Sequence, residues 1–244
     1  MTGVIFSLTV RQQILRKSTL LLIGLGLLAV IVAVVYRISD STMDPSEWTA
    51  RVLFGGLIVT AVLPLTALMF GTSVLGDELE DGTAVYLLTK PVPRWQILAP
   101  KIVAPWLLTA GLVSGAALLS GFIAIQDGDA SVVVGAAVAL AAGALAYITL
   151  FVLLSLMTNH ALIIGLLYVF IWEGALAGVF EGLRFMSIRH YTIGLANAVA
   201  GDLPDTYNAY LSGTTAIVAF ALVIAVCALW ANQRLQLIEV RERP

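Results

Sequence analysis

The stretch SVVVGAAVALAAGALAYITLFVLLSLM, residues 131–157, contains no Asp, Glu, Lys or Arg. At about 1.5 Å per residue, a helix of this length crosses the roughly 30 Å hydrocarbon core of a membrane. Five further runs are predominantly apolar, at residues 19–36, 52–75, 102–125, 161–180 and 213–230. The sequence therefore predicts an all-α integral membrane protein with six transmembrane helices in a single domain, residues 1–244.

The composition of the whole chain agrees with lipid as its solvent. Of the 244 residues, 60% are hydrophobic and 11% are charged, whereas a soluble domain has about half and about a quarter. Residues 1–17 precede the first apolar run and mix apolar with basic side chains. We expect them to form either an interfacial helix on the inner leaflet or a plain cytoplasmic lead-in.

The distribution of Lys and Arg predicts the orientation, because cytoplasmic loops carry the excess of these residues. With both termini in the cytoplasm, nine basic residues lie inside and four outside. The inner set is Arg11, Arg16, Lys17, Lys90, Arg94, Lys101, Arg234, Arg241 and Arg243, and the outer set is Arg37, Arg51, Arg184 and Arg189. We therefore expect a multi-pass protein of the inner (plasma) membrane with both termini cytoplasmic.

The residues that several kinds of chemistry require are missing. None of the lysines, Lys17, Lys90 and Lys101, lies in a Gly-rich phosphate-binding loop, so the chain cannot hydrolyse ATP by that route. The two histidines, His160 and His190, fall on opposite faces of the predicted topology, and Cys227 is the single cysteine. We expect no catalytic residues, no metal site and no bound cofactor in this chain.

The connection between the second and third runs carries the clearest signal: GDELEDGTAVYLLTKPVPRWQILAPK, residues 76–101. An acidic cluster opens it, a Gly-Thr pair can end one helix and cap the next, an apolar face follows, and prolines then break the helix. These features are carried by Asp77, Glu78, Glu80, Asp81, Gly82, Thr83, Leu87, Leu88, Pro91 and Pro93. Residues 77–100 are therefore either a short, stiff cytoplasmic helix that transmits force from a soluble partner, or an ordinary wet loop.

This segment resembles the signature of ABC-transporter permeases of the type-2 exporter family, and the six-run layout is also similar over essentially the whole chain. The matching residues are Glu78, Glu80, Asp81, Gly82, Thr83, Leu87, Leu88, Pro91, Val92, Arg94, Ile97, Leu98 and Lys101. The resemblance implies that residues 77–100 form a coupling helix on a separate ABC ATPase, which would bind ATP and Mg. The turn at His160 would be a second contact. It also implies an assembly of two permease chains, identical or different, with two ATPase chains.

The predicted outer side holds a second candidate region. Glu173 lies inside the fifth run, where a charge is costly and must face protein or water. We expect it either to contribute to a gate or substrate pathway or, in the simpler alternative, to pair with Arg184 or Arg189. Residues 181–211 are too polar for another span, and the resemblance implies that they form short extracellular re-entrant helices of an outer gate.

Small residues recur every four positions at Gly135, Ala139 and Gly143, a spacing that lets helices approach closely. We expect packing within one subunit to explain most such faces. Two other functions remain open at this point: a secondary transporter that needs no ATPase, and a membrane scaffold or assembly protein. The first predicts inverted repeats with paired intramembrane charges, whereas Glu173 stands alone within the runs.

Overall fold

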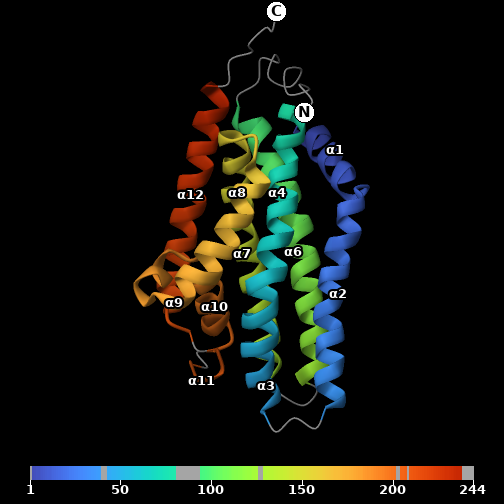
Figure 1. The fold of residues 1–244 in the computed structure, drawn as a ribbon, viewed down its shortest axis with the longest axis vertical. Coiled ribbons are helices and arrows are strands. Elements are labelled where there is room, and N and C mark those ends of the chain that lie inside the picture. Colours follow the sequence, from blue (N-terminus) through green and yellow to red (C-terminus); the bar gives the residue numbers. More distant parts are fainter. Residues whose placement is uncertain are drawn as a thin grey trace, which may run out of the picture.

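The computed structural model describes residues 2–39, 43–80, 94–125, 129–201, 204–207 and 209–237, and in these ranges the regular elements are all helices (Figure 1). Six helical stretches are long and apolar enough to span a membrane. They are Lys17–Ile38, Pro45–Gly76, Trp95–Ile125, Ala130–Met157, Ala161–Val179 and Gly213–Gln236. The prediction of an all-α protein with six membrane-spanning helices is confirmed.

Several spans are composed of more than one element. The elements are α1 (Thr2–Ile14), α2 (Lys17–Ile38), α3 (Pro45–Trp48), η1 (Thr49–Val62), α4 (Leu63–Glu80), α6 (Trp95–Ile125), α7 (Ala130–Met157), α8 (Ala161–Leu167), η2 (Tyr168–Leu176), α9 (Ala177–Val179), η3 (Glu181–Met186), α10 (Ile188–Val199), α11 (Pro204–Tyr207) and α12 (Gly213–Leu237). Helix α6 begins before the predicted residue 102, and α12 continues past the predicted residue 230. Hydropathy marks only the apolar part of a helix, whereas its backbone hydrogen bonds continue into polar sequence.

Helix α7 is the centre of the bundle. It packs against α4, α6, α10 and α12, and 67% of its most apolar window is buried. The corresponding value is 22% for α2, for the α8–η2–α9 span and for α12. The three peripheral spans therefore present most of their apolar surface outward, where a membrane supplies the lipid that covers it.

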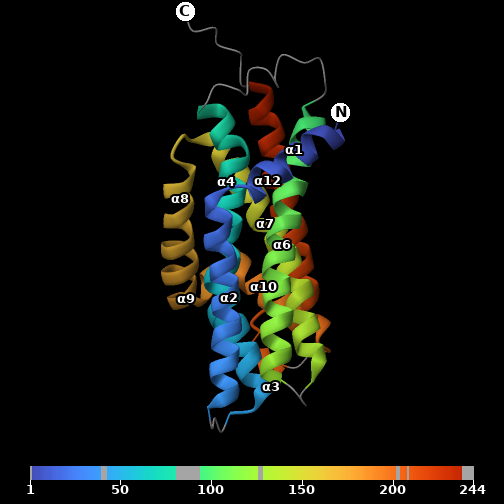
Figure 2. The same cartoon turned by 90° about the vertical axis from the view of Figure 1, so that its right-hand side faces the viewer.

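Helix α1 and the end of α12 lie at the same end of the bundle in both views (Figures 1 and 2). Residues 2–14 form a helix that packs against α6 and α4. The side-chain amide of Gln13 is buried and donates to the carbonyl oxygen of Phe70 in α4 at 3.0 Å. The lead-in is thereby attached to the bundle; we call this the terminal end.

Two spans contain π-helical winding, in which hydrogen bonds join residues five apart. In η1, the hydroxyl of Thr60 donates to the carbonyl of Gly55 at 2.7 Å, whereas the same residue type at Thr66 in α4 reaches only four residues back, to Val62. The second π-helix, η2, lies in the fifth span and includes Glu173. Winding of this kind is rare and often marks functional positions.

The small-residue face of α7 packs against α10, as expected for contact within one subunit. A Cβ atom added at Gly135 would come within 2.7 Å of the carbonyl oxygen of Ala196, and one at Gly143 within 2.6 Å of the Thr192 hydroxyl. Glycine is therefore what allows this approach. The buried hydroxyl of Tyr207 donates to the carbonyl of Val132 at 2.6 Å and fixes the loop after α10 to the start of α7.

Candidate functional site

The predicted coupling segment connects α4 to α6 along the chain, and the described ends of these two helices lie at the terminal end (Figure 1). Its central residues, Asp81, Gly82, Thr83, Leu87, Leu88 and Pro91, are outside the described residues. Glu78 and Glu80 are in the last turn of α4, and Arg94 directly precedes α6. The carbonyl of Arg94 accepts the backbone N–H groups of Ile97 and Leu98, each at 3.0 Å, which starts the helix at this point.

The two helices that flank this segment are joined through Lys101. Its side chain is 1% exposed, and Nζ donates to the carbonyl oxygen of Val74 in α4 at 3.0 Å. The sequence indicated only a basic residue near the start of the third span. Because an amine must be hydrogen-bonded when it is buried, Lys101 holds α6 against α4 two turns inside the bundle.

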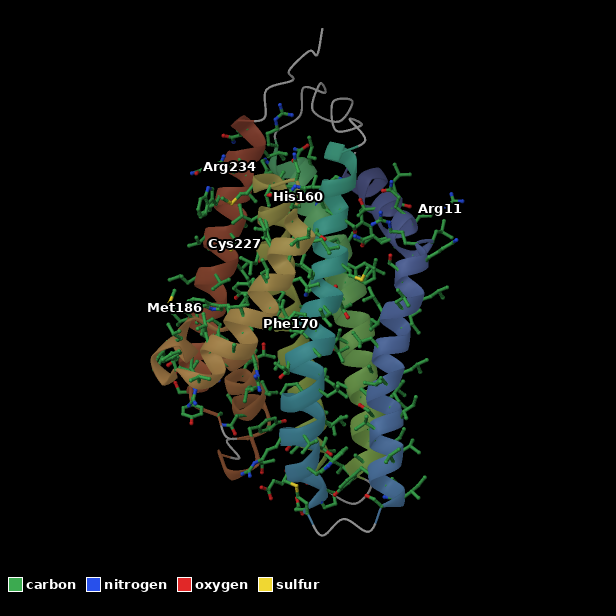
Figure 3. The ribbon with its side chains drawn as sticks, viewed as in Figure 1. Arg11, His160, Phe170, Met186, Cys227 and Arg234 are labelled. Atoms are coloured by element: carbon green, nitrogen blue, oxygen red, sulfur yellow. The ribbon has the colours of Figure 1, made fainter. Side chains whose placement is uncertain are left out.

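The turn that contains His160 lines a cavity at the same end. The backbone N–H of His160 donates to the hydroxyl of Thr158 at 3.2 Å, which shapes the turn between α7 and α8. The cavity has a volume of about 470 Å³ and also touches the α1–α2 corner and α4. Arg16 and Lys17 supply its cations, and Asn159 adds an amide. Figure 3 shows His160 and Arg234 toward this end of the bundle.

Glu173 is 4% exposed and lies where the fifth span meets the helices that follow it. Its Oε1 accepts the backbone N–H of Ile188 at 2.9 Å and the hydroxyl of Tyr168 at 3.1 Å. Its Oε2 accepts the hydroxyl of Ser187 at 2.5 Å. The expected pairing of Glu173 with an arginine is wrong: hydroxyl groups and the first N–H of α10 take that place.

The two arginines near this site have other positions. The guanidinium carbon of Arg184 lies 3.9 Å from the centre of the Tyr210 ring, a cation–π contact. Arg189 is on α10, half-buried. Neither side chain is required by the carboxylate, because an acid at a helix N-terminus is stabilised by the N–H groups and the helix dipole.

Ser187 and His190 complete the arrangement, and the role of Ser187 was not apparent from the sequence. Its hydroxyl oxygen caps α10 by accepting the backbone N–H of His190 at 3.4 Å, and Nδ1 of His190 lies 3.0 Å from the same oxygen. A serine directly before a helix is a capping signal, but it does not point to Glu173. Burial, followed by the cations Arg189 and Arg184, lowers the pKa of His190 to about 4.

Metal binding has no support in the part of the chain that the structure describes, where no three His, Cys, Asp or Glu side chains gather as ligands. The arrangement offers two different capacities instead. The terminal end has exposed polar and charged groups around helix ends, suited to contact with another protein. The Glu173 site is a closed hydrogen-bonded junction between a span and a short helix.

A comparison with protein-family models adds a match to the family described as "ABC-2 family transporter protein", over residues 12–180. The matched range extends from the end of α1 to the end of the fifth span, more than half of the chain. It contains the segment at residues 76–101, the His160 turn and Glu173. No curated protein matches the chain.

Proposed function

Since the match over residues 12–180 shows that this chain belongs to the ABC-2 family of transporter membrane proteins, we propose that it is the permease subunit of an exporter driven by a separate ABC ATPase. The observation that carries the proposal is the segment at residues 76–101, in which an acidic cluster, Gly-Thr, Pro-Val and Arg follow one another between two membrane-spanning helices. ATP and Mg bind to the ATPase, and this chain forms the translocation pathway.

Force enters at the terminal end, which is cytoplasmic in this proposal. The coupling residues are Glu78, Glu80, Asp81, Gly82, Thr83, Leu87, Leu88, Pro91 and Arg94, with His160 as a smaller second contact. Movement of the segment pulls on α4 and α6 together, because Lys101 of α6 hydrogen-bonds to Val74 of α4. Two permease chains and two ATPase chains form the working pump, and closure of the ATPase pair changes the accessibility of the pathway.

The outer gate consists of η3, α10 and the junction at Glu173. The carboxylate fixes the N-terminus of α10 to the fifth span, while α10 packs against α7 and α12. Displacement of the fifth span therefore carries α10 with it. Arg184 and Arg189 lie on η3 and α10 and supply positive charge at this gate.

The decisive experiment combines affinity purification with a charge reversal. An affinity-tagged chain is purified from its native membranes, and we expect an ABC ATPase to co-purify. The triple change Glu78→Lys, Glu80→Lys and Asp81→Lys should abolish this co-purification and the ATPase activity of the reconstituted complex. The matched control is Glu47→Lys, which alters a partly exposed acid in the Glu47–Arg51 ion pair at the other end of the bundle.

Two results would contradict the proposal. Recovery of no ABC ATPase with the wild-type chain would favour a secondary transporter or an assembly protein. Unchanged co-purification and activity in the triple variant would remove the coupling role from this segment. Flux that depends on ATP in vesicles containing both proteins excludes the two alternatives.

A further inference from the structure

A continuous line of hydrogen bonds leads from a half-buried histidine to a buried acid. Nδ1 of His190 lies 3.0 Å from the hydroxyl oxygen of Ser187, and that hydroxyl lies 2.5 Å from Oε2 of Glu173. Ser187 is 0% exposed and Glu173 is 4% exposed. Direct contact of the carboxylate with water is therefore small, whereas His190 at the other end of the line is half-buried.

The direction of the bonds follows from the count of protons. A serine hydroxyl has one proton to donate. When Ser187 donates it to the carboxylate of Glu173, the bond between Ser187 and His190 needs its proton from Nδ1. His190 is then the Nδ1–H tautomer, and its Nε2 carries a lone pair.

From this geometry we propose that Glu173 is a proton-binding site that is loaded from His190 through Ser187. A proton from water binds to Nε2 of His190, the Nδ1 proton passes to the oxygen of Ser187, and the original Ser187 proton passes to Oε2 of Glu173. One proton enters and one carboxylate becomes a carboxylic acid. The histidine ends as the neutral Nε2–H tautomer, and the two hydrogen bonds are reversed in direction.

The surroundings favour binding of the proton to Glu173 rather than to His190. The neighbouring cations Arg189 and Arg184, together with burial, keep the pKa of His190 near 4, so the imidazole transfers a proton without retaining it. The titratable and charged groups around the line are Tyr168 on η2, Tyr147 on α7, Arg189 and Tyr191 on α10, Arg184 on η3 and Cys227 on α12. Glu173 is the acid within that set.

Protonation of Glu173 weakens the contact that it makes between the fifth span and α10. A carboxylate is a stronger acceptor than a carboxylic acid, since charge-assisted hydrogen bonds are roughly twice as strong as neutral ones. The bond from the N–H of Ile188 and the favourable interaction with the N-terminus of α10 both lose the negative charge. Proton binding thus loosens α10 from the fifth span, independently of any ATPase partner.

Infrared difference spectroscopy after a rapid drop in pH tests the proposal on the full chain in lipid nanodiscs. We expect the carbonyl band of a buried protonated carboxyl group to appear in the wild type and to be absent in Glu173→Gln. The control Glu47→Gln, at the partly exposed acid of the Glu47–Arg51 ion pair, should retain the band. Absence of the band in the wild type, or its survival in Glu173→Gln, would refute proton binding at this residue.

The route is tested by the rate at which the same band appears. His190→Gln and Ser187→Ala should slow it at least about tenfold, which corresponds to about 1.4 kcal/mol in the barrier, and should leave its final size unchanged. Ser131→Ala is the matched control, because that hydroxyl bonds to the carbonyl of Ala200 at the other end of α10. If Ser187→Ala does not fold, His190→Gln alone decides, since its side chain is half-buried. Wild-type rates in His190→Gln would refute the relay.

Discussion

Lys101 and Glu173 are the two charged side chains that are buried in the described part of the chain, and their surroundings differ. Lys101 is a donor near the terminal end, where its amine reaches the carbonyl of Val74 and the neighbouring elements leave a polar cavity. Glu173 is an acceptor that receives three hydrogen bonds at the junction between the fifth span and α10. The first charge joins two long helices through a single backbone carbonyl, and the second joins a span to a short helix through three donors.

This difference has an energetic consequence. A backbone carbonyl has two lone pairs, so Val74 can still accept a helical hydrogen bond if the amine of Lys101 is removed. Buried N–H and O–H donors have no such reserve and become unsatisfied when their acceptor is lost. We therefore expect the Glu173 junction to be the more sensitive of the two regions, and the following changes test that ranking.

The largest effect is expected for Glu173→Ala. It leaves the N–H of Ile188 and the hydroxyls of Ser187 and Tyr168 without their acceptor, at a cost of about 3 kcal/mol in the free energy of unfolding. Denaturant unfolding in detergent micelles measures this cost. Glu47→Ala is the control, because its partly exposed ion pair with Arg51 contributes about 0–1 kcal/mol; equal losses in the two variants would show that the Glu173 junction does not stabilise the fold.

A smaller effect, with opposite signs at two sites, is expected for glycine to alanine changes. Gly135→Ala places a Cβ atom 2.7 Å from the carbonyl of Ala196, so α10 must move away from α7 at a cost of about 1–3 kcal/mol. Gly111→Ala on α6 meets nothing within 4 Å in the described residues, and the better helix propensity of alanine adds up to about 1 kcal/mol. Thermal unfolding midpoints should therefore fall in the first variant and stay or rise in the second.

The smallest effect compares single hydroxyl groups in the two regions. Tyr207→Phe removes the buried bond to Val132 between the loop after α10 and α7 and should cost about 1 kcal/mol. Ser73→Ala removes a hydroxyl at the wall of the terminal cavity, whose 3.2 Å bond goes to Phe70 within the same helix, and should change stability by less than about 0.5 kcal/mol. A larger loss in Ser73→Ala, measured by the same unfolding assay, would contradict the expectation that the contact after α10 is the more sensitive of these two.

The fold was accessible from the sequence because lipid imposes a length and an apolar composition on each span. Helix ends were less accessible: Trp95 begins α6 in sequence too polar for a hydropathy criterion, although Arg94 and the two prolines before it mark the boundary. The face formed by Gly135, Ala139 and Gly143 was visible as a spacing. The spacing does not show that α10 packs on this face. That contact depends on how the chain folds back after the fifth span, which no local pattern encodes.

The candidate site was predicted only in part, for a related reason. Glu173 stands out as a charge in an apolar run, but its partners Ser187 and Ile188 follow a 3₁₀ turn and meet it through the rotation of a π-helical segment. The residue types required for π winding do not form a recognisable pattern. The role of residues 77–100 and of His160 stays a prediction from resemblance.

The π-helical winding of Thr49–Val62 means that the second span contains more residues than its length needs. A π turn holds more residues than an α turn, so the stretch Thr49–Val62 is shorter than an α-helix of the same sequence. Rewinding any of these turns to α geometry would lengthen the span and rotate everything that follows it, including the last turn of α4. The chain thus carries in its second span a means of changing length and angle without breaking a covalent bond or unfolding a helix.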